Sequence, residues 1–185
     1  MRPTPRLASA ACAFTVAAAG LVFGAGSADA TTPHEPLNAT GSCSQSYLPL
    51  PDPVCQPGAY NPDVTQDTID STICVSGWTK TVRPPTSYTN PLKVQQISEY
   101  GYSDTSTADY EEDHLIPLEL GGAPRDPQNL WPEPRYTTGG ETAGDKDTIE
   151  NKLKVSVCNG QVTLDDARQA IATDWTTALS AVGIG

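Results

Sequence analysis

The sequence lacks several patterns that would assign it to a familiar class. It has no Cys-x-x-Cys pair, which disfavours a zinc site, and no internal repeat, which disfavours a repeat array. A Gly-x-Ser-x-Gly nucleophile elbow is also missing, so an acyl hydrolase with a Ser-His-Asp triad is not expected. After the first 30 residues no apolar run is long enough to cross a bilayer.

Basic residues are scarce as well. The chain has 11 Lys and Arg residues against 22 Asp and Glu residues. Such an acidic chain stays soluble, but it is a poor general binder of nucleic acid, whose phosphates are normally held by a basic surface. Any contact with a polyanion must therefore come from a local group of cations.

The N-terminus has the features of a secretory signal peptide. Arg2 and Arg6 precede an apolar stretch over residues 7–25, and an Ala-Asp-Ala triplet ending at Ala30 matches the small-x-small pattern at cleavage sites. We predict a signal peptide over 1–30, cleavage after Ala30 and secretion. Cleavage removes two of the 11 basic residues and one of the 22 acidic residues, which leaves 9 against 21 and a net charge of −12.

The remaining 155 residues (185 minus 30) are near the length of one domain. Residues 31–63 are rich in Pro, Ser and Thr, and we predict a flexible leader there. A single domain is predicted over 64–182, and we expect it to be monomeric.

Four cysteines remain after cleavage, an even number in an oxidising compartment, and this favours two disulfides over metal ligands. Three pairings are possible. We favour Cys43–Cys55, because it is local, and Cys74–Cys158, because it would tie the beginning of the domain to its end.

Turn and cap residues predict the first elements of this domain. Residues 77–83 are expected to be extended and to end at the following Pro-Pro pair. A helix is expected next, with Asn90 as its N-cap, Pro91 at its first position and Gly101 as its C-terminal cap.

Two further helices are predicted in the C-terminal part. The first covers about 145–157, with Ile149, Leu153 and Val157 as its apolar stripe. The second is capped by Thr163, and its Trp175 is expected in the core.

The segment with the clearest chemistry lies at 112–122 and has the sequence Glu-Asp-His-Leu-Ile-Pro-Leu-Glu-Leu-Gly-Gly. It contains His114, one of only two histidines, directly after Asp113. The Gly-Gly pair predicts a turn that sends the chain back through Asn129 and Leu130.

The order Asp-His-Leu-Ile-Pro-Leu, Gly-Gly, Asn-Leu and then a helix resembles the HNH endonuclease family, whose fold is the ββα-metal hairpin followed by a helix. The resemblance covers residues 110–158, about a third of the chain that remains after cleavage. The chain is also similar to small secreted HNH proteins of the actinobacterial type. The resemblance implies a ββα-metal (HNH) hairpin-plus-helix core. Together with the helices and disulfides predicted above, this gives an α+β fold that is mostly helical outside the hairpin.

The resemblance also implies roles for three residues. In the family the histidine is the general base, the preceding aspartate binds the metal, and the middle asparagine holds the hairpin loop. By position these are His114, Asp113 and Asn129. The chemistry agrees, because phosphodiester hydrolysis needs an activated water and a cation, and Mg²⁺ prefers oxygen ligands and retains several waters. We therefore expect a divalent metal, Mg²⁺ or Mn²⁺.

A regular strand would point Asp113 and His114 to opposite faces, so the backbone at this point is expected to be irregular. The second metal ligand is expected on the helix at 145–157, where Asn151 is preferred and Asp147 is the alternative. Glu150 lies between Lys146 and Lys154, a spacing typical of a solvent-facing row of charges.

The predicted substrate-binding cations near the motif are Arg125, Arg135 and Lys146. The sequence thus favours a secreted metal-dependent endonuclease, and DNA is favoured over RNA as its substrate. The alternative is a catalytically silent module of the same fold that acts as an envelope or extracellular interaction protein, and the acidic composition favours it.

Overall fold

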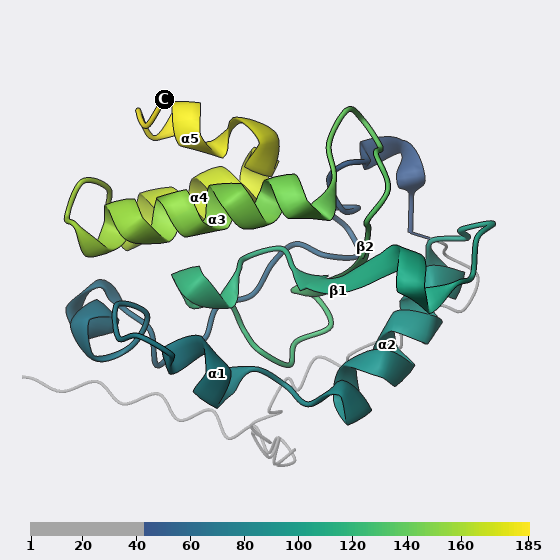
Figure 1. Ribbon diagram of the computed structural model, residues 1–185, viewed down its shortest axis with the longest axis horizontal. Coiled ribbons are helices and arrows are strands. Elements are labelled where there is room, and N and C mark those ends of the chain that lie inside the picture. Colours follow the sequence, from purple (N-terminus) through teal and green to yellow (C-terminus); the bar gives the residue numbers. More distant parts are fainter. Residues whose placement is uncertain (1–42) are drawn as a thin grey trace, which may run out of the picture. The chain divides into compact units, whose positions relative to one another are not determined.

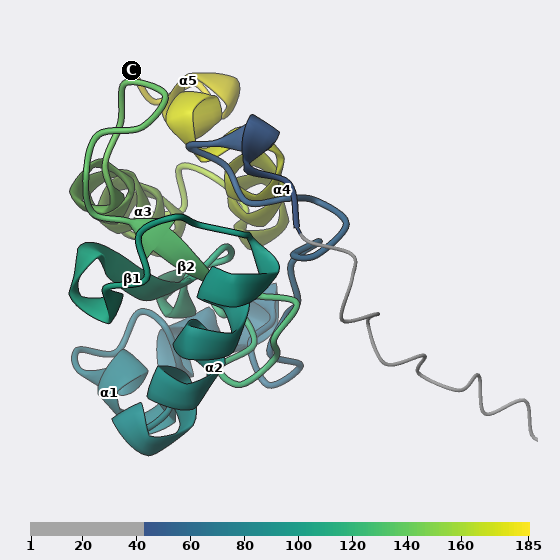
Figure 2. The ribbon, with the colours of Figure 1, turned by 90° about the vertical axis from the view of Figure 1, so that its right-hand side faces the viewer.

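Two antiparallel strands lie between two groups of helices in residues 43–185, the part of the chain that the computed structural model describes. β1 (Tyr110–His114) pairs with β2 (Leu130–Pro134), so that Asp113 lies opposite Trp131 and His114 opposite Leu130. The α-helices of this described part are α1 (Trp78–Val82), α2 (Thr86–Glu99), α3 (Ala143–Cys158), α4 (Leu164–Asp174) and α5 (Ala178–Ala181). Figures 1 and 2 show α3, α4 and α5 on one side of the strand pair and α1 and α2 on the other.

The α+β class expected from the sequence is confirmed for these residues. Short 3₁₀ helices complete the fold at Gln45–Tyr47, Gln66–Ser71, Thr107–Asp109, Leu118–Leu120 and Trp175–Thr177. Among the described helices, none combines the length and apolarity that crossing a membrane requires. The predicted signal peptide and residues 31–42 of the predicted leader lie outside the described residues.

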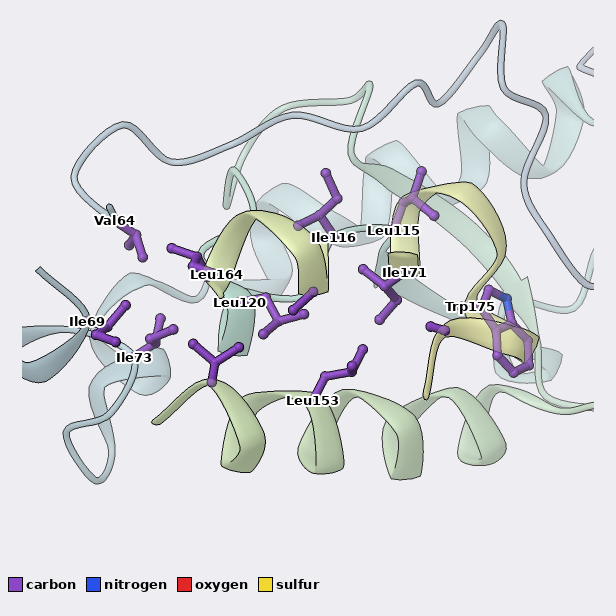
Figure 3. Close-up of a cluster of buried hydrophobic side chains, with 13 residues drawn as sticks. Val64, Ile69, Ile73, Leu115, Ile116, Leu120, Leu153, Leu164, Ile171 and Trp175 are labelled. Carbon is purple, nitrogen blue, oxygen red and sulfur yellow. The ribbon is translucent and has the colours of Figure 1, made fainter. Parts of the chain in front are cut away.

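The main apolar core lies between α3, α4 and the segment that follows β1 (Figure 3). Leu153 of α3, Ile171 of α4 and Leu120 are all fully buried. Trp175 is also fully buried, and its indole donates a hydrogen bond to the carbonyl of Pro49 (3.1 Å). The predicted core position of Trp175 is thereby confirmed.

A second, aromatic cluster packs against both strands. Tyr100 and Tyr102 stack, Tyr102 and Tyr110 lie with ring centroids 4.7 Å apart, and Trp131 packs beside them. Buried Cys43 belongs to the same cluster. This cluster anchors the beginning of the described chain to the strands.

The prediction of a flexible leader is wrong for residues 43–63, because they pack against the domain. Asp52 is buried, and its amide donates a hydrogen bond to the hydroxyl of Tyr100 (3.0 Å). The same hydroxyl bonds to the buried side chain of Gln56. A Pro-rich composition predicts irregular backbone, which is present, but irregular backbone held by buried hydrogen bonds is ordered.

Both favoured disulfides are present. Cys43 is bonded to Cys55 across 12 residues, and Cys74 is bonded to Cys158 across 84 residues. The second bond joins the segment before α1 to the last residue of α3. It therefore closes a loop that contains both strands.

Two element predictions near the N-terminus need correction. The segment expected to be extended forms α1 instead, and its backbone bonds close within the helical turn, as in the bond from the amide of Arg83 to the carbonyl of Thr79 (2.9 Å). The next helix begins at Thr86, directly after the Pro-Pro pair, and not at Asn90. Pro91 lies inside α2, which gives up one backbone hydrogen bond there and does not begin at that residue.

The two C-terminal helices lie where the sequence placed them. In α3, Leu153 and Val157 are fully buried and Ile149 packs against the core, as the apolar stripe predicted. α4 begins after Thr163, whose hydroxyl accepts a hydrogen bond from the amide of Asp166 (3.1 Å), as the cap pattern predicted.

Candidate functional site

A cavity of about 240 Å³ opens where β1 ends against α3. It contains His114 and Asp113 together with both helix residues considered as metal ligands, Asp147 and Asn151. The complete lining is Arg83, Glu111, Asp113, His114, Pro117, Leu118, Glu119, Asp147, Glu150 and Asn151. The Asp-His pair of the motif and the two candidate ligands on α3 thus line one cavity.

A larger and more open hollow of about 550 Å³ lies between α4 and α5. Its lining includes Asp166, Asp174 and several Thr and Gln residues, but neither a histidine nor a Lys or Arg. The smaller cavity is the better candidate for chemistry, because it contains a base, carboxylates and a cation.

Asp113 and His114 share the cavity although β1 is regular up to its last residue. His114 is that last residue, and the chain bends at the next two positions. The cavity therefore lies at the strand end, where side chains from both faces can reach it. The irregular backbone expected at this point follows His114 and does not lie between the two residues.

The ring of His114 is almost fully buried, at 4 % exposure. Its Nε2 lies 3.2 Å from the carbonyl oxygen of Pro124. Because a carbonyl only accepts hydrogen bonds, Nε2 carries the proton in the neutral ring, and Nδ1 is left as the basic nitrogen. Burial lowers the pKa of His114, although Asp113 and the Pro124 carbonyl partly oppose this. The imidazole is consequently neutral at neutral pH, the form that accepts a proton.

The side chain of Asn129 forms hydrogen bonds to the beginning and the middle of the loop between the strands. The side chain is fully buried, its oxygen accepts from the amide of Ile116 (2.9 Å), and its nitrogen donates to the carbonyls of Ile116 (3.0 Å) and Ala123 (3.2 Å). Ala123 directly precedes Pro124, the partner of His114. These bonds join two parts of the loop to Asn129, the position for which the resemblance implies a loop-holding role.

Replacing Asn129 with alanine should leave the amide and carbonyl of Ile116 buried without partners. We expect the free energy of unfolding to fall by about 2–3 kcal/mol. Chemical denaturation of the variant measures this, with Asn90→Ala on the exposed side of α2 as the matched control. A loss as small as that of the control would contradict the anchoring role of Asn129.

Neighbouring atoms leave no room for a side chain at either glycine of the predicted turn. Gly121 has a φ of +72°, and a Cβ on Gly122 would lie 1.7 Å from the carbonyl oxygen of Ile116. Buried Arg168 of α4 donates to the carbonyls of Leu120 (2.7 Å) and Gly121 (3.2 Å). Sequence reasoning did not identify Arg168, because its partners are backbone atoms about 47 residues away in the chain.

Lys146 is not the surface cation that the sequence predicted. It is fully buried, and its ammonium donates to Asp113 Oδ2 (2.6 Å), to the carbonyl of His114 (2.9 Å) and to the carboxylate of Glu150. Lys146, Glu150 and Leu153 are spaced i, i+4 and i+7, so they occupy the helix face that turns inward. The predicted solvent-facing row of charges is therefore wrong for Lys146 and Glu150.

The electrostatics of this cluster centre on Asp113. Burial alone would raise the pKa of Asp113, but the adjacent ammonium of Lys146 lowers it below its usual value. Burial likewise disfavours the charged form of Lys146, yet Asp113, Glu150 and Glu133 together raise its pKa. Asp113 and Lys146 therefore form a buried ion pair.

Glu133 of β2 is a further buried acid that the sequence did not single out. It is 2 % exposed, and neither carboxyl oxygen has a hydrogen-bond donor among the described residues. Burial and the nearby charge of Asp113 raise its pKa well above the usual range. Burial in this position therefore favours the protonated form of Glu133 over its carboxylate.

The other predicted substrate cations, Arg125 and Arg135, do not line the cavity. Arg125 is exposed and lies over the ring of Tyr88 (5.9 Å to its centroid). Arg135 pairs with Glu111, a lining residue, at 2.9 Å and remains half exposed. The exposed cation in the lining is Arg83, which follows α1 and lies 31 positions before His114, too far for proximity in sequence to reveal it.

The lining offers oxygen donors suited to a hard cation. Asp113, Asp147 and Asn151 all contribute an oxygen, and Oε2 of Glu119 is buried with no hydrogen-bond partner among the described residues. Within residues 43–185, however, no three His, Cys, Asp or Glu side chains converge closely enough to form a metal cage. These donors suit an ion such as Mg²⁺, which keeps most of its waters and needs only one or two protein ligands.

No family model matches the chain, and neither a curated protein nor a solved structure matches it. The resemblance to HNH endonucleases therefore depends on the residues of the motif.

Proposed function

We propose that the protein is a secreted, metal-dependent endonuclease of the HNH type, which hydrolyses phosphodiester bonds of DNA with His114 as general base. The observation that carries the proposal is the shared cavity, in which the His114 ring lies with Asp113 and the α3 oxygens of Asp147 and Asn151. The chain order of β1, β2 and α3 supports the hairpin-plus-helix core. The two disulfides support an oxidising, extracellular location.

His114 has the properties of a general base. Its Nε2 is held by the Pro124 carbonyl, which leaves Nδ1 to take a proton from a water that attacks phosphorus. Asn129 fixes the loop that carries Pro124, so it positions the base without touching the substrate. Burial keeps the ring neutral and therefore able to accept the proton.

The carboxylate of Asp113, with the amide oxygen of Asn151 or the carboxylate of Asp147, would hold Mg²⁺ or Mn²⁺. A divalent ion there supplies positive charge that offsets the charge developing on the phosphate. Lys146 cannot contribute to substrate binding in this scheme, because its ammonium is saturated by three protein acceptors. The predicted substrate contact through Lys146 is replaced by one through Arg83.

Arg83 is the exposed cation of the lining and is well placed to bind the substrate phosphate. We expect Arg83→Ala to raise KM for a DNA substrate about tenfold with a smaller change in kcat, because the contact forms before the chemical step. Lys80→Ala, a change of an α1 cation outside the lining, is the matched control. Steady-state kinetics measure both, and an unchanged KM in Arg83→Ala would remove this residue from substrate binding.

A plasmid-nicking assay tests the function. The purified protein, without its predicted signal peptide, should convert supercoiled plasmid to open circles with Mg²⁺ or Mn²⁺, and chelation with EDTA should stop the reaction. An RNA substrate of matched length tests the preference for DNA. If neither nucleic acid is cleaved with either ion, the protein is not a nuclease.

One observation favours the second candidate, a catalytically silent module that acts as an extracellular interaction protein. Asp113 already has a cation, Lys146, and no cage of three ligating side chains is present in residues 43–185. A silent module would show no nicking and no heat of Mn²⁺ binding in a calorimetric titration.

A further inference from the structure

The buried ammonium of Lys146 is bound in the way a small cation would be. Its three N–H groups meet three oxygens, from Asp113, Glu150 and the backbone carbonyl of His114. An ammonium has three donors, so none remains for another partner. Oxygen atoms of carboxylates and carbonyls are also the ligands that hard divalent cations take.

The surroundings of Lys146 contain more acids than bases. Asp113 and Glu150 accept its hydrogen bonds, and buried Glu133 adds a third carboxyl group beside Asp113. Asp113 and Glu150 also line the cavity, where their side chains keep 14 % and 11 % exposure. Each of these two carboxylates thus has one oxygen on the ammonium and keeps some exposure toward the cavity.

We propose that Lys146 is the resident cation of the cavity, and that its ammonium competes with divalent ions for Asp113 and Glu150. The inference deepens the proposed function, since it concerns the same Asp113 and rests on that residue being a metal ligand. The ammonium neutralises the inner part of the acidic cluster. A divalent ion is thereby limited to the cavity-facing oxygens and is held weakly.

The physical reason is repulsion between like charges that cannot move apart. Lys146 is fully buried and fixed at three points, so it cannot swing away when an ion enters beside Asp113. Charges at such short separations interact strongly where water is excluded. A lysine that only filled space or shaped the helix would not have this effect on ion affinity.

Calorimetric titration of the full chain with Mn²⁺ alone, without nucleic acid, tests the inference. Lys146→Met keeps the length of the side chain and removes its charge. We expect the Mn²⁺ affinity of this variant to rise about tenfold or more above that of the unaltered protein. Lys152→Met, at an exposed position of the same helix, should leave the affinity unchanged.

A second pair of variants protects the test against misfolding, because Lys146→Met leaves buried acids without their cation. Glu150→Gln and the double variant Lys146→Met/Glu150→Gln differ only in the lysine. The double variant should bind Mn²⁺ about tenfold more tightly than Glu150→Gln. Circular dichroism verifies that both are folded.

Equal or weaker Mn²⁺ binding after loss of the lysine, in folded protein of either pair, overturns the inference. Its failure is distinguishable from that of the nuclease proposal. If the unaltered protein neither cleaves DNA nor binds Mn²⁺ but Lys146→Met gains Mn²⁺ binding, the nuclease proposal fails and the resident cation stands. If the unaltered protein cleaves DNA and removal of Lys146 leaves its Mn²⁺ affinity unchanged, the nuclease proposal stands and the resident cation is ruled out.

Discussion

Replacing His114 with alanine is expected to reduce plasmid nicking about 10²–10⁴-fold, the range that a positioned general base contributes. The reason is that Nδ1 of His114 is the basic nitrogen at the cavity, since Nε2 is held by the carbonyl of Pro124 (3.2 Å). The measurement is the initial rate of open-circle formation with saturating Mg²⁺. Asp113 and the α3 oxygens remain in the variant, so ion binding should survive.

The matched control for this variant is provided by the sequence itself. His34→Ala removes the only other histidine and should leave the rate unchanged. Thermal unfolding of His114→Ala shows whether the fold is retained, because His114 is buried and packed. Nicking that persists at the normal rate in a folded His114→Ala protein would show that His114 takes no part in the mechanism.

The pH dependence of the reaction gives an independent readout of the same nitrogen. Burial lowers the pKa of His114 below that of a free imidazole, about 6.5. As pH falls through this lowered pKa, Nδ1 becomes protonated and kcat/KM should fall, so the acidic limb should lie below about pH 6.5. A cation bound at Asp113 would lower the pKa further, in the same direction. A limb that lies clearly above pH 6.5 would contradict the role of the buried ring.

The core of the site could be predicted because its parts are close in sequence and chemically distinctive. Asp113, His114 and Asn129 all belong to one strand–loop–strand segment, where a turn at Gly121 and Gly122 must bring the chain back. Residues that meet through a short loop need no long-range information. The positions of these residues therefore followed from spacing and turn chemistry.

The parts that could not be predicted depend on tertiary contacts. Lys146 was expected at the surface, because helical charges at i and i+4 usually face solvent, and only the acidic pocket under α3 makes its burial favourable. Arg83 reaches the cavity from α1, whose helical form was itself missed. Local composition similarly suggested flexibility for residues 43–63, which are held by Tyr100, the residue after α2, and by a disulfide.

Removing the disulfide between Cys74 and Cys158 is expected to lower the free energy of unfolding by about 4–5 kcal/mol in the chain-entropy model. The bond closes a loop of 84 residues that contains α1, α2 and both strands. Opening it frees a long unfolded chain, and the entropy gained by the unfolded state grows with loop length. Urea denaturation of Cys74→Ala/Cys158→Ala, compared with the unaltered oxidised protein, measures the loss.

Cys43→Ala/Cys55→Ala is the matched control, because it removes a disulfide that spans only 12 residues. Its expected loss is about 3 kcal/mol in the same model, so the variant without the longer loop should lose more free energy of unfolding. A larger loss from the short loop would show that packing of residues 43–63 on the aromatic cluster, and not loop entropy, dominates. Asp147 and Asn151 lie in the body of α3, away from Cys158 at its end. The long-loop variant should therefore retain its nicking activity at temperatures where it remains folded, which separates stability from catalysis.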